Sequence, residues 1–155
     1  MKAWMLLALA SVLGAPAVAQ LPSHGAYPVQ VQEFAAPAVP LIEDANLREL
    51  EPVLREALSG VPDFAGDQVL VQWGCGSDCL RLLAADRGSG GLVVLPAVAC
   101  CWEGEGEMLD YRADSRLLVL NGRLDTARGH GRHYYVFKDG RFVPVGFEPV
   151  PAPGD

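Results

Sequence analysis

Residues 68–86 read QVLVQWGCGSDCLRLLAAD and carry the clearest folding signal in the chain. In the first six residues two sets of side chains alternate, namely Val69, Val71 and Trp73 with Gln68, Leu70 and Gln72. This period of two is typical of a β-strand, whose side chains point to opposite faces in turn. A second apolar run, LRLLAAD, follows a glycine-containing stretch that holds two cysteines. The segment therefore predicts a β-hairpin.

Further strand-like runs fill the rest of the chain. They read GLVVLPA, SRLLVLNG, HYYVF and RFVPVGF, and Gly, Asp or Asn residues separate them. The stretches DRGSGG and KDGR are typical of hairpin turns, because Gly supplies positive φ and Asp tolerates it. We expect a mainly β fold: a single β-rich domain over residues 41–147 with an antiparallel meander sheet of about five to seven strands.

One helix is predicted before the hairpin, in the stretch EDANLRELEPVLREALSG at residues 43–60. Its apolar side chains recur at helical spacing, at Leu47, Leu50, Val53, Leu54 and Leu58. Because proline suits only the first turn of a helix, Pro52 favours a short helix over residues 52–59 after a looser turn. Asn46 and Glu49 have the spacing of a capping box, and Gly60 is placed to end the helix. We expect this helix to pack on one face of the sheet.

The first nineteen residues are typical of a signal peptide. Lys2 supplies a positive charge, residues 4–13 form an apolar run too short to span a bilayer, and residues 17–19 read Ala-Val-Ala. We expect cleavage between Ala19 and Gln20. The residue directly after that point is not a cysteine that could carry a lipid anchor. No later stretch is long and apolar enough for a membrane helix. The sequence thus predicts an exported protein without a membrane anchor, periplasmic or secreted.

The two ends of the mature chain are rich in proline. Residues 20–40 contain many Pro and Ala residues, and we expect an extended arm. Within it Val29, Val31 and Phe34 are spaced to form one short edge strand. Residues 148–155 contain three prolines and are expected to be a flexible tail.

The charge of the chain limits its partners. The formal net charge is −7, and loss of Lys2 with the signal peptide makes the mature chain more acidic still. Nucleic acids and anionic lipid surfaces select basic proteins, so neither is an expected partner. A basic protein of the cell envelope is the kind of partner that this charge allows. Phosphate-loop and dinucleotide motifs are missing from the sequence, so we expect no cofactor.

Four cysteines, Cys75, Cys79, Cys100 and Cys101, are expected to be oxidised in an exported chain. Four cysteines allow three pairings. We favour Cys75–Cys79, because Gly74 and the glycine between the two cysteines let the backbone turn tightly enough for a disulfide. Cys100 and Cys101 would then form a vicinal bridge. The sequence also allows Cys100 and Cys101 to pair with Cys75 and Cys79, or to remain as one buried and one reactive thiol.

Five short stretches together resemble a family of small exported bacterial proteins of uncharacterised function. They are Phe64-Ala65-Gly66, Trp73-Gly74-Cys75-Gly76 with Cys79, Asp86 with its glycine turn, Ser115-Arg116-Leu117-Leu118, and Tyr134-Tyr135-Val136. The family pattern reads N-F-A-G-H-Y and then W-G-C-G-x-x-C, and the resemblance covers residues 31–145. This chain departs from it with Asp63 in place of Asn and Asp67-Gln68 in place of His-Tyr. The resemblance implies an exported β domain and no particular activity.

Residue spacing also bears on metal binding and on hydrolysis. His130 and His133 could join the cysteines in a metal site, but the spacing also fits a surface histidine beside a strand residue, and we predict no metal site. Four carboxylates, on Glu103, Glu105, Glu107 and Asp110, lack the spacing of a calcium-binding loop, so a solvated loop is expected. Ser89 lies in a glycine turn and not in a nucleophile elbow.

Two hypotheses for the function follow. The first is a non-enzymatic binding or structural module of the cell envelope, which we favour because catalytic residue sets are missing from the sequence. The alternative is a thiol-dependent or hydrolytic exported enzyme with a site near the cysteines. The C-x-x-x-C spacing between strands differs from the C-x-x-C of thioredoxin-like centres, which disfavours a redox centre of that type.

Overall fold

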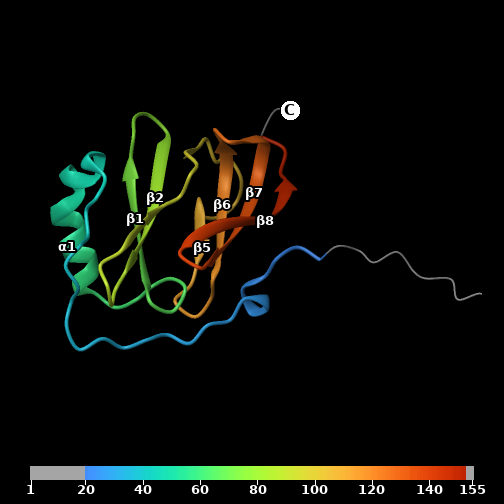
Figure 1. The fold of residues 1–155 in the computed structure, drawn as a ribbon. Helices are drawn as coiled ribbons and strands as arrows, with labels where there is room; N and C mark the ends of the chain where they lie inside the picture. The colour runs from blue at the N-terminus through green and yellow to red at the C-terminus, as the bar shows by residue number, and fades with distance from the viewer. Residues whose placement is uncertain (1–19, 153–155) are drawn as a thin grey trace, which may run out of the picture.

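The computed structural model describes residues 20–152 and confirms a mainly β fold with antiparallel pairing. The predicted signal peptide, residues 1–19, and the last three residues of the predicted tail lie outside the described part. Eight strands form one sheet in the order β1-β2-β4-β6-β7-β8, while β3 pairs with β2 and β5 pairs with β6 (Figure 1). The strands are β1 (Gln68–Gly74), β2 (Cys79–Asp86), β3 (Leu92–Val94), β4 (Ala99–Cys100), β5 (Leu109–Tyr111), β6 (Leu117–Leu124), β7 (Ala127–Lys138) and β8 (Arg141–Pro149).

The sheet has more strands than the five to seven predicted. The extra strands are β4 and β5, which have only two and three residues, too few to show a period of two. Strand β8 also extends to Pro149, so its end overlaps the segment assigned to the tail. The backbone N–H of Val150 donates to the carbonyl of His130, 3.0 Å away, and holds the end of β8 beside β7.

The predicted helix is present as α1, Glu51–Ser59, with Pro52 in its first turn. A 3₁₀ turn, η2 (Ala45–Leu50), precedes it and is the looser turn that Pro52 imposed. The N–H of Gly60 donates to the carbonyl of Ala57 at 3.0 Å and ends the helix. The predicted capping box is wrong.

The cap is formed by Asp44 and not by Asn46. Its Oδ1 accepts from the backbone N–H of Asn46 at 2.9 Å and from the Asn46 side chain at 2.8 Å. The 3₁₀ turn begins at Ala45, so Asn46 already lies inside it and cannot be the residue that caps it. A carboxylate before the turn satisfies donors that the turn itself leaves free.

Apolar side chains cover both faces of the sheet. On one face Leu54 and Leu58 of α1 are fully buried against Val71 and Leu83, and α1 lies along β1 in Figure 1. The other face carries the larger core, with Phe64 at its centre. The Phe64 ring stacks on that of Phe142 at 6.2 Å between centroids, and three aromatic neighbours surround it: Tyr111, Phe137 and Phe142.

The N-terminal arm crosses the domain from β6 to α1 (Figure 1). The predicted edge strand within it is wrong, because the arm forms a single bridge, between Pro28 and Ser115. Its other backbone bonds go to loops: Val29 N–H to the carbonyl of Asp114 at 2.9 Å and Gln32 N–H to the carbonyl of Gly66 at 2.8 Å. The arm's several prolines lack the N–H that a continuous ladder requires.

Arg87, at the β2–β3 turn, fastens the arm to the domain. Its side chain is buried, and its Nε and Nη1 donate to the carbonyls of Gly60 and Ala36 at 2.8 and 2.7 Å. The guanidinium also lies 5.7 Å from the centre of the Phe34 ring. One cation thus links the end of α1, the arm and the sheet.

Replacing Arg87 with methionine is expected to lower the free energy of unfolding by about 2 kcal/mol, because the carbonyls of Gly60 and Ala36 lose a charged donor. Urea unfolding followed by tryptophan fluorescence measures this loss. The matched control is Arg55→Met, which removes an exposed ion pair with Glu51 (2.7 Å) and should cost under about 1 kcal/mol. Equal losses in the two variants would show that Arg87 does not fasten the arm.

Candidate functional site

The favoured disulfide, Cys75–Cys79, is present at the tip of the β1–β2 hairpin. The two Cα atoms are 5.1 Å apart, and the N–H of Cys75 donates to the carbonyl of Cys79 at 3.3 Å. Asp78, inside the loop, has φ +54°, and Gly76 has φ +135°. Cys75 is exposed to solvent. The bridge closes one turn, as predicted.

The second disulfide joins the adjacent residues Cys100 and Cys101. Cys100 ends β4, and Cys101 is exposed and has φ +62°, a left-handed conformation that side chains other than glycine rarely adopt. The sheet register places Cys100 directly opposite Cys79 on one side and Arg123 on the other. The sequence favoured the first bridge and allowed the second, but it did not indicate that they lie side by side.

The loop after the vicinal disulfide is held by aromatic side chains. The His130 ring stacks on the Trp102 ring with centroids 5.2 Å apart, and Trp102 Nε1 donates to the carbonyl of Gly106 at 3.0 Å. The two ring nitrogens of His130 face the carbonyls of Cys101 and Val150, at 3.1 and 2.7 Å. These contacts fix the position of Cys101.

The interpretation of a surface histidine beside a strand residue is wrong in its surface part, because His130 and His133 both lie in β7 and both side chains are buried, at 7% and 4% exposure. His133 Nε2 lies 3.2 Å from the Gly122 carbonyl, and the ring of Phe147 covers it at 4.7 Å. Burial lowers the pKa of His133 from its usual 6.5, the bond to Gly122 opposes this, and the nearby His130 adds to the lowering. The strand β7 is longer than the sequence indicated and includes both histidines, whose side chains are covered by neighbouring residues.

The lowered pKa of His133 predicts a loss of stability in acid. Above pH 6.5 the ring is neutral in both states, and as the pH falls from 6.5 through the lower folded pKa the unfolded chain binds a proton first, so the folded state loses stability. His133→Gln keeps a donor for Gly122 and cannot titrate. Its urea midpoint should therefore fall less between pH 7.5 and 5.5 than that of the unmodified chain. Identical falls in the two proteins would contradict the assignment.

The remaining candidates are the four carboxylates that were expected in a solvated loop, and Ser89. Glu103, Glu105, Glu107 and Asp110 are all exposed. Within residues 20–152 no group of three or more histidine, cysteine, aspartate or glutamate side chains could hold a metal ion. Asp110 Oδ1 instead lies 3.1 Å from Nε2 of His24. Ser89 Oγ accepts from the N–H of Gly91 at 3.2 Å, inside the β2–β3 turn.

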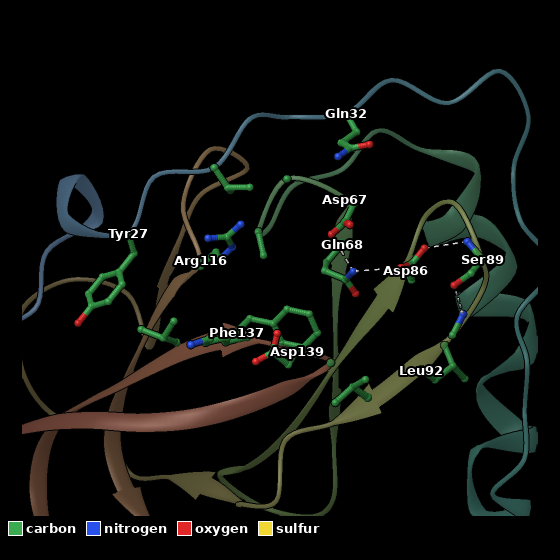
Figure 2. A pocket seen from close by; sticks show the side chains of 18 residues that line it. Tyr27, Gln32, Asp67, Gln68, Asp86, Ser89, Leu92, Arg116, Phe137 and Asp139 are labelled. Atoms are coloured by element: carbon green, nitrogen blue, oxygen red, sulfur yellow. Dashed lines mark hydrogen bonds between the residues drawn. The ribbon is translucent and has the colours of Figure 1, made fainter.

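A cleft of about 790 Å³ lies at the other end of the sheet (Figure 2). It is lined by the arm, the loop before β1, the β2–β3 turn with β3, Arg116 just before β6, and the end of β7 with the β7–β8 turn. Polar side chains are prominent among its lining residues: Tyr27, Gln32, Asp67, Gln68, Asp86, Ser89, Arg116, Lys138 and Asp139. No sequence pattern indicated this cleft, because it is assembled from segments that are far apart in the chain.

Hydrogen bonds fix the acidic wall of the cleft. The buried Gln68 donates through Nε2 to Asp67 Oδ1 at 2.8 Å and to Asp86 Oδ2 at 3.4 Å. Asp86 Oδ1 accepts from the backbone N–H groups of Gly88 and Ser89 at 2.9 and 2.7 Å. In Figure 2 this group stands across the cleft from Arg116. The cleft therefore presents carboxylates in a defined position opposite a cationic side.

No helix in residues 20–152 has the length and apolar character needed to cross a membrane. The fold and its bridges define a small antiparallel β domain with two disulfides. Comparison of the sequence and the structure with family models, curated proteins and solved structures yields no match.

Proposed function

We propose that this chain is an exported, non-enzymatic binding module of the cell envelope, and that the cleft holds a basic segment of a partner protein. The signal-peptide pattern in residues 1–19 supports export. The two disulfides support an oxidising compartment. The acidic net charge supports a basic partner.

The observation that carries the proposal is the hydrogen-bonded acidic wall of the cleft. Gln68 and the β2–β3 turn hold Asp67 and Asp86 in place before any ligand arrives. Preorganised charges lower the entropy lost on binding. A lysine or arginine side chain of the partner would pair with these carboxylates. Arg116 on the other side would donate hydrogen bonds to a carboxylate of the same segment.

The lining favours binding over catalysis. Its residues include neither histidine nor cysteine, and Ser89 Oγ is engaged by the Gly91 N–H. A nucleophile with an adjacent base is the usual requirement for hydrolysis. Asp67 and Gln68 also stand at the positions where the family that this chain resembles carries His-Tyr, so a ligand of this chain would meet different side chains there.

Binding of a fluorescent tetralysine peptide to the mature chain tests this proposal. Asp67→Asn/Asp139→Asn removes two charges from the cleft and should weaken binding about tenfold. The control Glu49→Gln/Glu56→Gln removes two charges from exposed positions near or on α1 and should leave the Kd within about twofold. Equal weakening in both, or peptide binding that does not saturate, would refute a specific site.

A further inference from the structure

The two disulfides form a single cluster of four cysteines. Cys79 and Cys100 are directly opposite partners in antiparallel strands. Such partners project their side chains on the same face, with Cβ atoms about 4.5–5.5 Å apart, close to the separation that a disulfide spans. The Sγ atoms of two different bridges therefore lie within reach of one another.

The two bridges differ in their surroundings. Cys101 is exposed and holds a left-handed backbone conformation, which is strained for a residue with a side chain. Strained and exposed disulfides are the more oxidising ones. Cys75–Cys79 closes a turn that two backbone hydrogen bonds support. Electrons should thus move from a reduced Cys75/Cys79 pair to Cys100–Cys101.

Arg123 adds a favourable charge to the cluster. It is the register partner of Cys100, so its side chain lies on the same face as the Cys79 and Cys100 side chains. A nearby guanidinium favours the thiolate, which is the reactive form of cysteine.

We propose that the two disulfides act together as a thiol–disulfide exchange unit that oxidises an external dithiol. A thiolate of the external dithiol attacks Sγ of the exposed Cys75, the Cys75–Cys79 bond breaks, and Cys79 leaves as a thiolate. The second external thiolate attacks the external sulfur of the mixed disulfide. The external molecule departs as a disulfide, and Cys75 is left reduced.

The electrons then pass to the vicinal bridge. The Cys79 thiolate attacks Sγ of Cys100, the Cys100–Cys101 bond breaks, and Cys101 leaves as a thiolate that takes a proton from water. The Cys75 thiolate attacks Cys79, which re-forms Cys75–Cys79 and releases Cys100. In sum, two electrons and two protons move from the external dithiol to Cys100–Cys101.

This exchange is independent of the proposed binding function. Cys79 is the first residue of β2 and Asp86 its last, so the cysteine cluster and the cleft lie at opposite ends of that strand. Failure of either proposal leaves the other standing.

The first experiment traps the intermediate bond. Cys75→Ser/Cys101→Ser keeps only Cys79 and Cys100, and after reduction and re-exposure to air we expect a Cys79–Cys100 disulfide in a non-reduced digest. The matched control, Cys79→Ser/Cys100→Ser, keeps the other two cysteines and should retain two thiols that react with iodoacetamide. Circular dichroism confirms that both variants are folded. Two free thiols in the folded first variant would overturn the proposal.

The second experiment uses the unmodified cysteines. With dithiothreitol as the external dithiol and iodoacetamide added at intervals, label should appear first on Cys75 and Cys79 and later on Cys100 and Cys101. In Cys75→Ser/Cys79→Ser the labelling of Cys100 and Cys101 should slow about tenfold, because an intramolecular thiolate no longer attacks. Labelling of Cys100 and Cys101 first, at an equal rate in both proteins, would overturn the proposal.

Discussion

Replacing Phe64 with alanine is expected to lower the free energy of unfolding by about 4 kcal/mol. Phe64 has no solvent exposure and sits among the rings of Tyr111, Phe137 and Phe142. The substitution removes the apolar contacts and leaves a cavity that strands on both sides cannot close. Since small domains are stable by only about 5–15 kcal/mol, the loss is a large part of the total.

Urea unfolding of Phe64→Ala measures this effect, and Phe147→Ala is its control. Phe147 is 41% exposed and packs chiefly on the ring of His133, so its removal should cost only about 1 kcal/mol. A Phe64→Ala variant with a urea midpoint no lower than that of Phe147→Ala would mean that the core is not centred on Phe64.

Gly122→Ala is expected to cost a similar amount, about 4 kcal/mol, for a different reason. Gly122 lies in β6 with φ +126°, where a side chain is strained by about 1–2 kcal/mol. In addition, its Cβ would lie 2.2 Å from the carbonyl oxygen of Cys100, which is backbone and cannot rotate away. Relief of that clash requires a shift of β4, and with it the vicinal disulfide.

Gly76→Ala separates the two causes. Gly76 has a similar φ of +135°, but no atom lies within 4 Å of the position its Cβ would take. It should therefore lose only the strain of about 1–2 kcal/mol. Thermal unfolding of both variants provides the comparison, and equal losses would show that the approach of Gly122 to Cys100 is unimportant.

The parts of the fold that depend on neighbouring residues could be predicted from the sequence. Pro52 set the start of α1 because its ring is accommodated only in the first turn. The glycine-containing turns fixed the hairpins at Asp86 and Lys138, and the short spacing of Cys75 and Cys79 indicated their bridge. Each of these signals is contained within a few residues.

The parts that depend on distant strands could not be predicted. The two-residue strand β4 places Cys100 opposite Cys79, and a stretch that short carries no periodic signal. The burial of His130 and His133 was hidden likewise, because the rings that pack on them, those of Trp102 and Phe147, come from a distant loop and from another strand. The cleft was hidden for a similar reason, since five separated segments build it.

The outer strand β8 has a consequence for self-association. As the last strand of the sheet it presents a row of backbone groups with which another chain could pair, and such edges promote aggregation. Pro144 and Pro149 within β8 have no N–H to offer, and a register shift opposite Tyr134 and Tyr135 interrupts the straight run. This edge therefore makes a poor template for a ninth strand.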